Sequence, residues 1–290
     1  MCETLGVEAP SSEIFESWIF ARRLFIDIAN ETFKGDPILP RGHREGENAD
    51  LFEYFESKNV PRSSAEALIE ELGCFSLRLS RALSRRSVNP QSVRCVRLSH
   101  GDVHFRVGKA KLRLNAGHLS KLKSMFQHKD KTWTKAKQKD FDDSVSALLL
   151  RYVSLQDTGM QAACPEDVFK FLHQEFSVSF ECFASPLNAY FGRFCSAFPD
   201  VDHCFGSCGS FFQFFPKTGS FQANPPFTEL VIKAMKIHMD SLLRQTELPL
   251  SFVVIVPAWK KSKAWAMLNK SRFMTRHVLL SQGKHGYCDG

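Results

Sequence analysis

The spacing of apolar residues along the chain changes near residue 160. Before that point, apolar side chains mostly recur every three or four positions, as in an amphipathic helix. The pattern predicts helices over 13–33, 50–55, 63–83, 114–126 and 141–152. One stretch differs: Val93 to Val107 is rich in β-branched residues around a Ser-His-Gly-Asp turn, which predicts a hairpin. Residues 35–47 hold two prolines and three glycines, so we predict a loop there.

After residue 160, short apolar runs alternate with loops and helices. The runs predicted as strands are 178–183, 210–215, 219–223, 251–256 and 278–280, and 226–243 has helical spacing. The run 251–256 is apolar at nearly every position, which is typical of a parallel-sheet strand buried on both faces. Alternating strands and helices indicate an α/β fold. We therefore divide the chain into a mostly helical, basic module (1–160) and an α/β module (161–290).

Composition narrows the class of protein. The 290 residues are 43% hydrophobic and include 27 Phe, which indicates a globular chain with an aromatic-rich core. The longest strongly apolar run is far too short to cross a bilayer, so we expect no membrane partner. The nine cysteines form no CxxC pair, and His203, Cys204 and Cys208 lack a fourth ligand. We therefore expect reduced thiols and no metal site.

Positive charge is concentrated in one tract. The net charge is +7, and residues 109–139 hold nine Lys, one Arg and one Asp. This tract has two interpretations. It is either the solvated surface of helices and loops, or an electrostatic path for a phosphate backbone, with Trp133 available for base stacking. Arg85 and Arg86 are further candidate RNA contacts on the second interpretation.

The sequence Asn224-Pro225-Pro226-Phe227 carries the strongest chemical signal. It follows a β-prone run and precedes a predicted helix, where α/β sheets bind ligands at the carboxyl ends of strands. Methylation of an adenine amine builds positive charge on its nitrogen, which the Asn224 side-chain oxygen and the Pro225 carbonyl would stabilise. The prolines fix the backbone that presents this carbonyl, and Phe227 would stack on the base. The alternative is a simple Pro-Pro turn with Asn as a turn former.

The residues around this motif carry a family resemblance. The segments 180–188, 195–202, 205–207, 219–227, 249–259 and 271–277, together with Glu229, resemble in order the core of the phosphorylated-CTD-interacting-factor family. The resemblance is clear over about residues 145–287 and loose before them. It implies a Rossmann-like sheet that binds S-adenosyl-L-methionine and methylates N6 of a 2′-O-methylated adenosine beside the 7-methylguanosine cap of mRNA.

The resemblance also assigns residues to roles. Catalysis falls to Asn224, Pro225, Pro226 and Phe227; cofactor binding falls to Glu181, Phe183, Ala184, Ser185, Asn188, Asp200, Asn224 and Glu229; substrate binding falls to Phe227, Glu229, Trp259, Lys284, His285 and Tyr287. Two assignments have alternatives. The alternative for Glu181 is an ordinary carboxylate at the end of a strand, without a role in cofactor binding. The alternative to Asp200 is Asp202, as the acidic residue that contacts the ribose.

The sequence departs from the family pattern in three respects. Cys208 stands where the family has Arg, no Trp pair has the spacing of a WW domain, and the chain ends before a further strand of the family. The resemblance thus implies capped mRNA, a nuclear location and the polymerase II tail as a partner, the last without a WW domain here. Two alternatives stay open: a truncated or impaired relative that binds capped RNA without methylating it, and a methyltransferase acting on DNA or another adenine.

Overall fold

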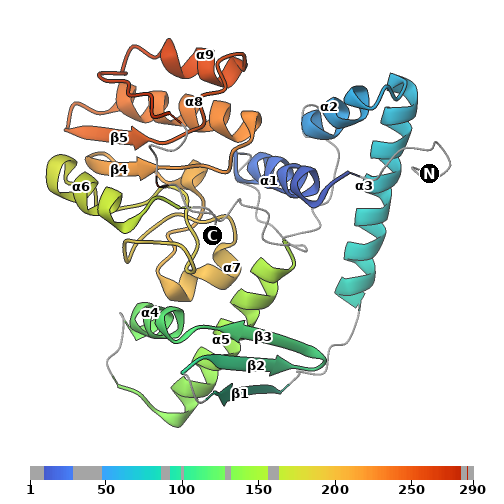
Figure 1. The fold of residues 1–290 in the computed structure, drawn as a ribbon, viewed down its shortest axis with the longest axis vertical. Coiled ribbons are helices and arrows are strands. Elements are labelled where there is room, and N and C mark those ends of the chain that lie inside the picture. Colours follow the sequence, from blue (N-terminus) through green and yellow to red (C-terminus); the bar gives the residue numbers. More distant parts are fainter. Residues whose placement is uncertain are drawn as a thin grey trace. The chain divides into compact units, whose positions relative to one another are not determined.

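The computed structural model describes residues 10–28, 48–85, 92–98, 101–127, 132–155, 163–281 and 286 (Figure 1). It is a mixed α/β structure, and the chain divides into two compact units. The first unit comprises Met1–Ser87, Pro225–His238 and Pro257–Met274, and the second comprises Val88–Asn224, Met239–Val256 and Thr275–Gly290. No helix in the described part of the chain is long and apolar enough to cross a membrane.

The first unit is helical where it is described. It holds α1 (Ser12–Ile28), α2 (Ala49–Ser57), α3 (Arg62–Arg85), the start of α8 (Glu229–Gln245) and α9 (Lys263–Asn269). Its core includes Trp18 and Leu51, both at most 1% exposed, and the Trp18 indole donates to Asn48 Oδ1 at 2.8 Å. The predicted helices 50–55 and 63–83 are confirmed, and the predicted helix 13–33 is confirmed as far as residue 28. Residues 29–33 and the predicted loop 35–47 lie outside the described residues.

An antiparallel sheet in the second unit confirms the predicted hairpin and extends it. The strands β1 (Val93–Arg97), β2 (Val103–Val107) and β3 (Ala110–Leu114) pair in that order. Cys95 lies opposite Phe105, and Phe105 opposite Leu112. This face packs on α5 (Lys135–Val153), and Phe105 is fully buried. The predicted helices 114–126 and 141–152 are confirmed as α4 (Ala116–Gln127) and α5.

Parallel pairing organises the rest of the second unit. The strands β4 (Gly219–Ala223) and β5 (Leu250–Val254) are parallel, with Gln222 opposite Val253. Single parallel bridges join Gln222 to Glu181, Glu181 to Phe194 and Phe194 to Ser207. The spatial order is therefore Ser207, Phe194, Glu181, Gln222, Val253. The segment through Glu181 comes first in the chain but lies in the middle, so the chain turns to one side of it and later to the other.

Several predictions for this region were wrong, because apolar runs alone do not distinguish strands from turns. The run 210–215 forms a 3-10 turn, η3 (Phe211–Gln213), in which the Ser210 hydroxyl accepts from the Phe212 N–H. Residues 278–280 are not in a strand and are 51–61% exposed. The strand β5 is partly exposed instead of buried on both faces, and among the described residues it pairs with β4 alone.

Candidate active site

Three predicted site segments follow the carboxyl ends of neighbouring parallel strands. Asn224 follows β4, Ala184 follows the segment through Glu181, and Asp200 follows the segment through Phe194. Further bonds continue the pairing at this edge: Ile255 N donates to Ala223 O, and Ala184 N to Cys195 O, each at 2.9 Å. Because neighbouring strands lie about 4.8 Å apart, the three segments start close together at one edge of the sheet.

The Asn224-Pro225-Pro226-Phe227 segment connects β4 to α8 over a very short path. The Thr228 N–H donates to the Pro226 carbonyl at 2.7 Å, and the Thr228 hydroxyl accepts from Val231 N at 3.2 Å. Thr228 therefore acts as the cap that starts α8. A paired strand therefore directly precedes the segment in the chain, and a capped helix directly follows it.

Phe227, Glu229 and Trp259 belong to the first unit. The Phe227 and Trp259 ring centroids are 6.5 Å apart at an interplanar angle of 80°, and Trp259 is 42% exposed. This edge-to-face contact fixes the relative orientation of two aromatic side chains that follow β4 and β5 in the sequence. Glu229 lies in the first turn of α8 and forms an ion pair with Lys233. A carboxylate at that position also stabilises the start of the helix.

Glu181 is a buried carboxylate that organises the loop following its own strand. It is 3% exposed and accepts the Tyr190 and Phe191 N–H groups through Oε1 at 2.8 and 2.9 Å. Burial raises the pKa of Glu181 to about 7, while those N–H groups and the Lys121 ammonium oppose the shift. The carboxylate thus joins the start of the loop 182–191 to its end through hydrogen bonds. This role is structural and does not depend on what the loop binds.

The loop after Glu181 is held in one conformation by its own polar groups. Asn188 Oδ1 accepts from the Ser185 N–H at 2.7 Å and from the Ser185 hydroxyl at 3.1 Å. Lys121 reaches the loop from α4 and donates to the Leu187 carbonyl at 3.1 Å. Phe183, at the start of the loop, packs against Phe211, with ring centroids 5.0 Å apart. The predicted cofactor segment is therefore preformed.

The two candidate ribose carboxylates lie in different environments. Asp200 forms a two-pronged ion pair with Arg151 at 2.9 and 2.7 Å, and about half of its side chain is exposed. Asp202 is fully buried and accepts from the Tyr152 hydroxyl at 2.8 Å. Burial raises the pKa of Asp202 to about 7, with a further contribution from Asp200. The accessible carboxylate at this sheet edge is Asp200, and Arg151 fixes its orientation.

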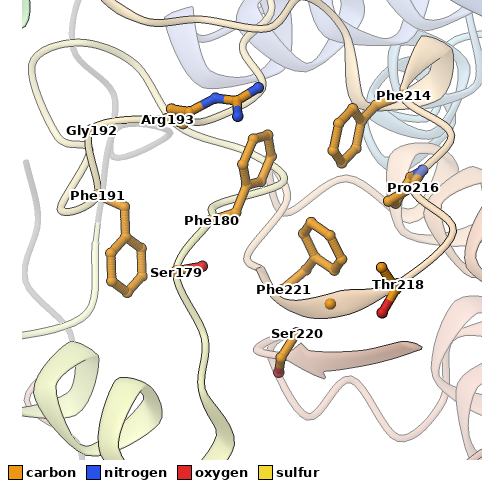
Figure 2. A pocket seen from close by; sticks show the side chains of 11 residues that line it. Ser179, Phe180, Phe191, Gly192, Arg193, Phe214, Pro216, Thr218, Ser220 and Phe221 are labelled. Carbon is orange, nitrogen blue, oxygen red and sulfur yellow. The ribbon is translucent and has the colours of Figure 1, made fainter. Parts of the chain in front are cut away.

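A cavity of about 600 Å³ opens at the opposite edge of the parallel strands (Figure 2). Its lining includes Ser179, Phe180 and Gly219, which lie at or before the amino-terminal ends of the paired segments, and none of the predicted site residues. The cavity is lined largely by aromatic rings, among them Phe214 and Phe221. Because ligands of open α/β sheets bind beyond the carboxyl ends, the candidate site lies at the other edge.

The remaining predictions concern lysines, metals and the end of the chain. The described lysines of 109–139 lie in the turn before β3 and on β3, α4 and α5, and Lys123 Nζ lies 4.4 Å from the Trp133 ring centroid. One face of that ring is thereby covered by an ammonium group. Across the described ranges, no three His, Cys, Asp or Glu side chains form a group that could hold a metal. Lys284, His285 and Tyr287 lie outside the described residues.

Three residues of this region were not predicted. Lys121, Arg151 and Tyr152 contact the candidate site across 66, 49 and 50 residues of sequence. All three lie on α4 or α5, within the predicted helical, basic module 1–160. Nothing in their local sequence marks them, because each acquires its partner only through tertiary packing. Only a comparison of pairs that vary together among relatives would have revealed them.

The structure defines a mixed α/β protein in which several predicted site segments follow the carboxyl ends of parallel strands. The chain belongs to the phosphorylated CTD interacting factor 1 family, since the family model described as "Phosphorylated CTD interacting factor 1 WW domain" matches residues 121–290. It is 42% identical over 176 residues to a Homo sapiens protein and 45% identical over 154 residues to one from Mus musculus. Both are named mRNA (2'-O-methyladenosine-N(6)-)-methyltransferase.

The aligned regions cover part of each protein. They take in 55% of this chain and 25% of the human protein, and 50% of this chain and 22% of the mouse protein. The chain thus spans about a quarter of the length of the curated relatives it matches.

Proposed function

We propose that this chain transfers a methyl group from S-adenosyl-L-methionine to N6 of the 2′-O-methylated adenosine beside the mRNA cap. The observation that carries the proposal is the place of Asn224-Pro225-Pro226-Phe227. The segment begins at the carboxyl end of β4, beside the preformed loop that follows Glu181. The names of the human and mouse relatives support the same activity and substrate.

The proposed fold of the catalytic part, residues 161–290, is a Rossmann-like methyltransferase sheet. Counted by chain order, the parallel segments lie in the order third, second, first, fourth, fifth. This is the order of a doubly wound sheet, whose ligand crevice opens where the chain changes side. That point lies beside Glu181, so the strand order supports a cofactor site at the loop 183–188.

The residues present fit the methyl donor in shape and charge. Ala184 and Ser185 are small, the loop is preformed, and Asp200 is an accessible carboxylate suited to a ribose diol. The loop 183–188, Asp200 and Asn224 would hold the donor, with Glu181 supporting the loop from beneath. When bound, S-adenosyl-L-methionine supplies an electrophilic methyl on a sulfonium.

The chain's own residues would prepare the adenine amine for attack. The Asn224 side-chain oxygen and the Pro225 carbonyl accept hydrogen bonds from the amine and stabilise its growing positive charge. Phe227 stacks on the base and fixes its angle of approach, and Trp259 supports the Phe227 ring. Glu229, in the first turn of α8, would border the same base. Because the amine stays neutral until it attacks, no general base is required.

The wider partners follow from the same proposal. We propose that residues 1–160 contribute contacts to the capped mRNA and that the protein acts in the nucleus near the polymerase II tail. The family description, which names interaction with the phosphorylated tail, supports that partner. Lys284, His285 and Tyr287 remain proposed substrate contacts.

Methyl transfer from labelled S-adenosyl-L-methionine to a short capped RNA beginning with 2′-O-methyladenosine tests the proposal. Uncapped RNA of the same sequence and a DNA strand serve as matched substrates. We expect transfer to the capped RNA alone. Transfer to DNA would assign a different adenine substrate. Binding of capped RNA without any transfer, by a protein that is folded and binds the donor, would identify a relative that binds without methylating.

A further inference from the structure

The outward face of the antiparallel sheet carries a row of like charges. In the register of the sheet, Arg94 lies opposite Arg106, and Arg106 lies opposite Lys111. All three residues are exposed. The row crosses β1, β2 and β3 at about 4.8 Å per strand, and Lys109 adds a fourth cation at the turn between β2 and β3.

Burial of the other face fixes this row in place. Side chains alternate between the two faces of a strand, so Phe105, beside Arg106, and Leu112, beside Lys111, point to the interior. Phe105 is fully buried, and Leu112 is 6% exposed. A shift of one residue would bury the cations against α5 and expose these apolar side chains. The charged row is therefore a stable feature of the fold.

The sheet gains no stability from this arrangement. Like charges directly opposite one another on a sheet destabilise it, and here two such pairs are adjacent. Among the described residues, the carboxylate beside the row is Asp102, which forms a two-pronged ion pair with Arg113 at 3.0 and 2.8 Å. Desolvation and the charges of Lys111, Arg113 and Arg106 lower the pKa of His104, which reflects how closely cations surround this side chain. An anion bound over the row would offset the repulsion.

We infer that the outward face of β1–β3 binds the phosphate backbone of an RNA chain through Arg94, Arg106 and Lys111. The inference rests on the proposed function, because a capped mRNA is a polyanion longer than the nucleotide that is methylated. Guanidinium groups suit phosphate because they donate two parallel hydrogen bonds to it. The sheet belongs to the same compact unit as Asn224 and the loop after Glu181. On this inference the face contacts a part of the transcript beyond the methylated nucleotide.

A salt titration tests the contact without requiring activity. The variant R94Q/R106Q/K111Q is compared with R94K/R106K, which keeps the charge, and with R62Q/K170Q/R244Q, which removes three cations from exposed helices. Binding of a labelled, uncapped single-stranded RNA is measured over a range of salt. Each lost phosphate contact lowers the slope of log affinity against log salt by about 0.7. We therefore expect the first variant to lose about 2 from the slope, and both controls to lose much less.

Two outcomes would overturn the inference. One is an unchanged affinity and slope for R94Q/R106Q/K111Q. The other is polyglutamate binding that depends on these cations while RNA binding does not, which would assign the face to an acidic protein. Methyl transfer gives an independent reading: the variant should raise the KM for a long capped RNA several-fold and leave a capped dinucleotide unaffected. If no protein methylates either substrate, the proposed function fails, and the titration still decides the RNA contact.

Discussion

The two sheets of the second unit differ in where their polar side chains lie. The antiparallel sheet buries one face against α5 and leaves the other to solvent, so its charges lie on a broad surface. The parallel segments through Phe194, Glu181, Gln222 and Val253 have polar residues such as Glu181, Ser185 and Asn224 near or beyond their carboxyl ends. Pleat alternation produces the first arrangement, and parallel connection produces the second.

This difference separates two kinds of chemistry within one compact unit. A face that repeats Arg and Lys across strands suits a repeating, sequence-independent ligand such as a phosphate backbone. An edge where several strands end gathers different side chains around one small volume, which suits a reaction at a single atom. Variants at the edge should therefore change the reaction and spare the salt-dependent binding. Variants on the face should do the reverse.

The largest effect is expected for Asn224→Ala at the edge. Removing one acceptor for the charge that grows on the amine should lower the methylation rate about a hundredfold or more. Affinity for S-adenosylhomocysteine, measured by calorimetry, should fall much less, and the salt slope for uncapped RNA should stay unchanged. Asn269→Ala on α9 is the control for a general loss of folding. A variant with full activity would show that Asn224 is only a turn residue.

Local patterns in the sequence predicted the elements around the site whose formation depends on residues close together in the chain. Gly219–Ala223 forms the predicted strand, and α8 follows the Asn-Pro-Pro-Phe segment as expected. The same reasoning failed for residues 278–280, whose apolar character does not determine whether a partner strand lies beside them. The strand β3 was missed, although Lys111 and Arg113 alternate with Leu112 and Leu114 as a half-buried strand requires.

Long-range contacts were beyond the reach of such patterns. The sequence placed Asp200 near a ribose, but it carried no sign that Arg151 orients this carboxylate. It marked Glu181 without revealing that two loop N–H groups occupy Oε1. These contacts depend on how α5 and the loop pack, and packing is not encoded in the spacing of residues along one segment.

Glu181→Gln tests whether the buried carboxylate at the edge makes stability depend on pH. The pKa of Glu181 rises from an ordinary 4.5 to about 7 in the folded protein. The folded state therefore binds a proton more tightly than the unfolded state, and stability declines as pH rises from 4.5 through 7. Glutamine keeps an acceptor for the two N–H groups without the charge. Relative to the unmodified protein, the variant should gain roughly 1–3 kcal/mol between about pH 5 and pH 8.

Urea unfolding at several pH values measures this difference, and the exposed Glu247→Gln serves as the control. Asp202 is also buried with its pKa raised to about 7, so the variant should retain part of the decline. Parallel pH profiles for the variant and the unmodified protein would show that Glu181 carries the same charge in the folded and unfolded states.

Phe227→Ala tests the base-stacking role beside the edge. Loss of stacking should cost roughly 1–3 kcal/mol in kcat/KM for capped RNA. The contact with Trp259 would be lost as well, so Trp259→Ala should produce a smaller change of the same kind. Phe176→Ala, at an exposed position on α6 (Glu166–Phe176), controls for removal of an aromatic ring. An unaltered KM and kcat in Phe227→Ala would mean that the ring serves packing alone.

Lys121→Met tests whether the contact from α4 stabilises the loop that follows Glu181. Methionine keeps the length of the side chain but cannot donate to the Leu187 carbonyl, which the Lys121 ammonium reaches at 3.1 Å. Loss of that bond from a charged donor should weaken S-adenosylhomocysteine binding by about tenfold, or about 1.4 kcal/mol. The ammonium also opposes the rise in the pKa of Glu181, so its removal should move that pKa further upward.

Lys139→Met, at an exposed position on α5, is the matched control. Because Lys121 touches the loop and not the reacting amine, kcat at saturating donor should change little. A fall in kcat with unchanged donor affinity would instead place Lys121 nearer the reacting atoms than the loop contact allows.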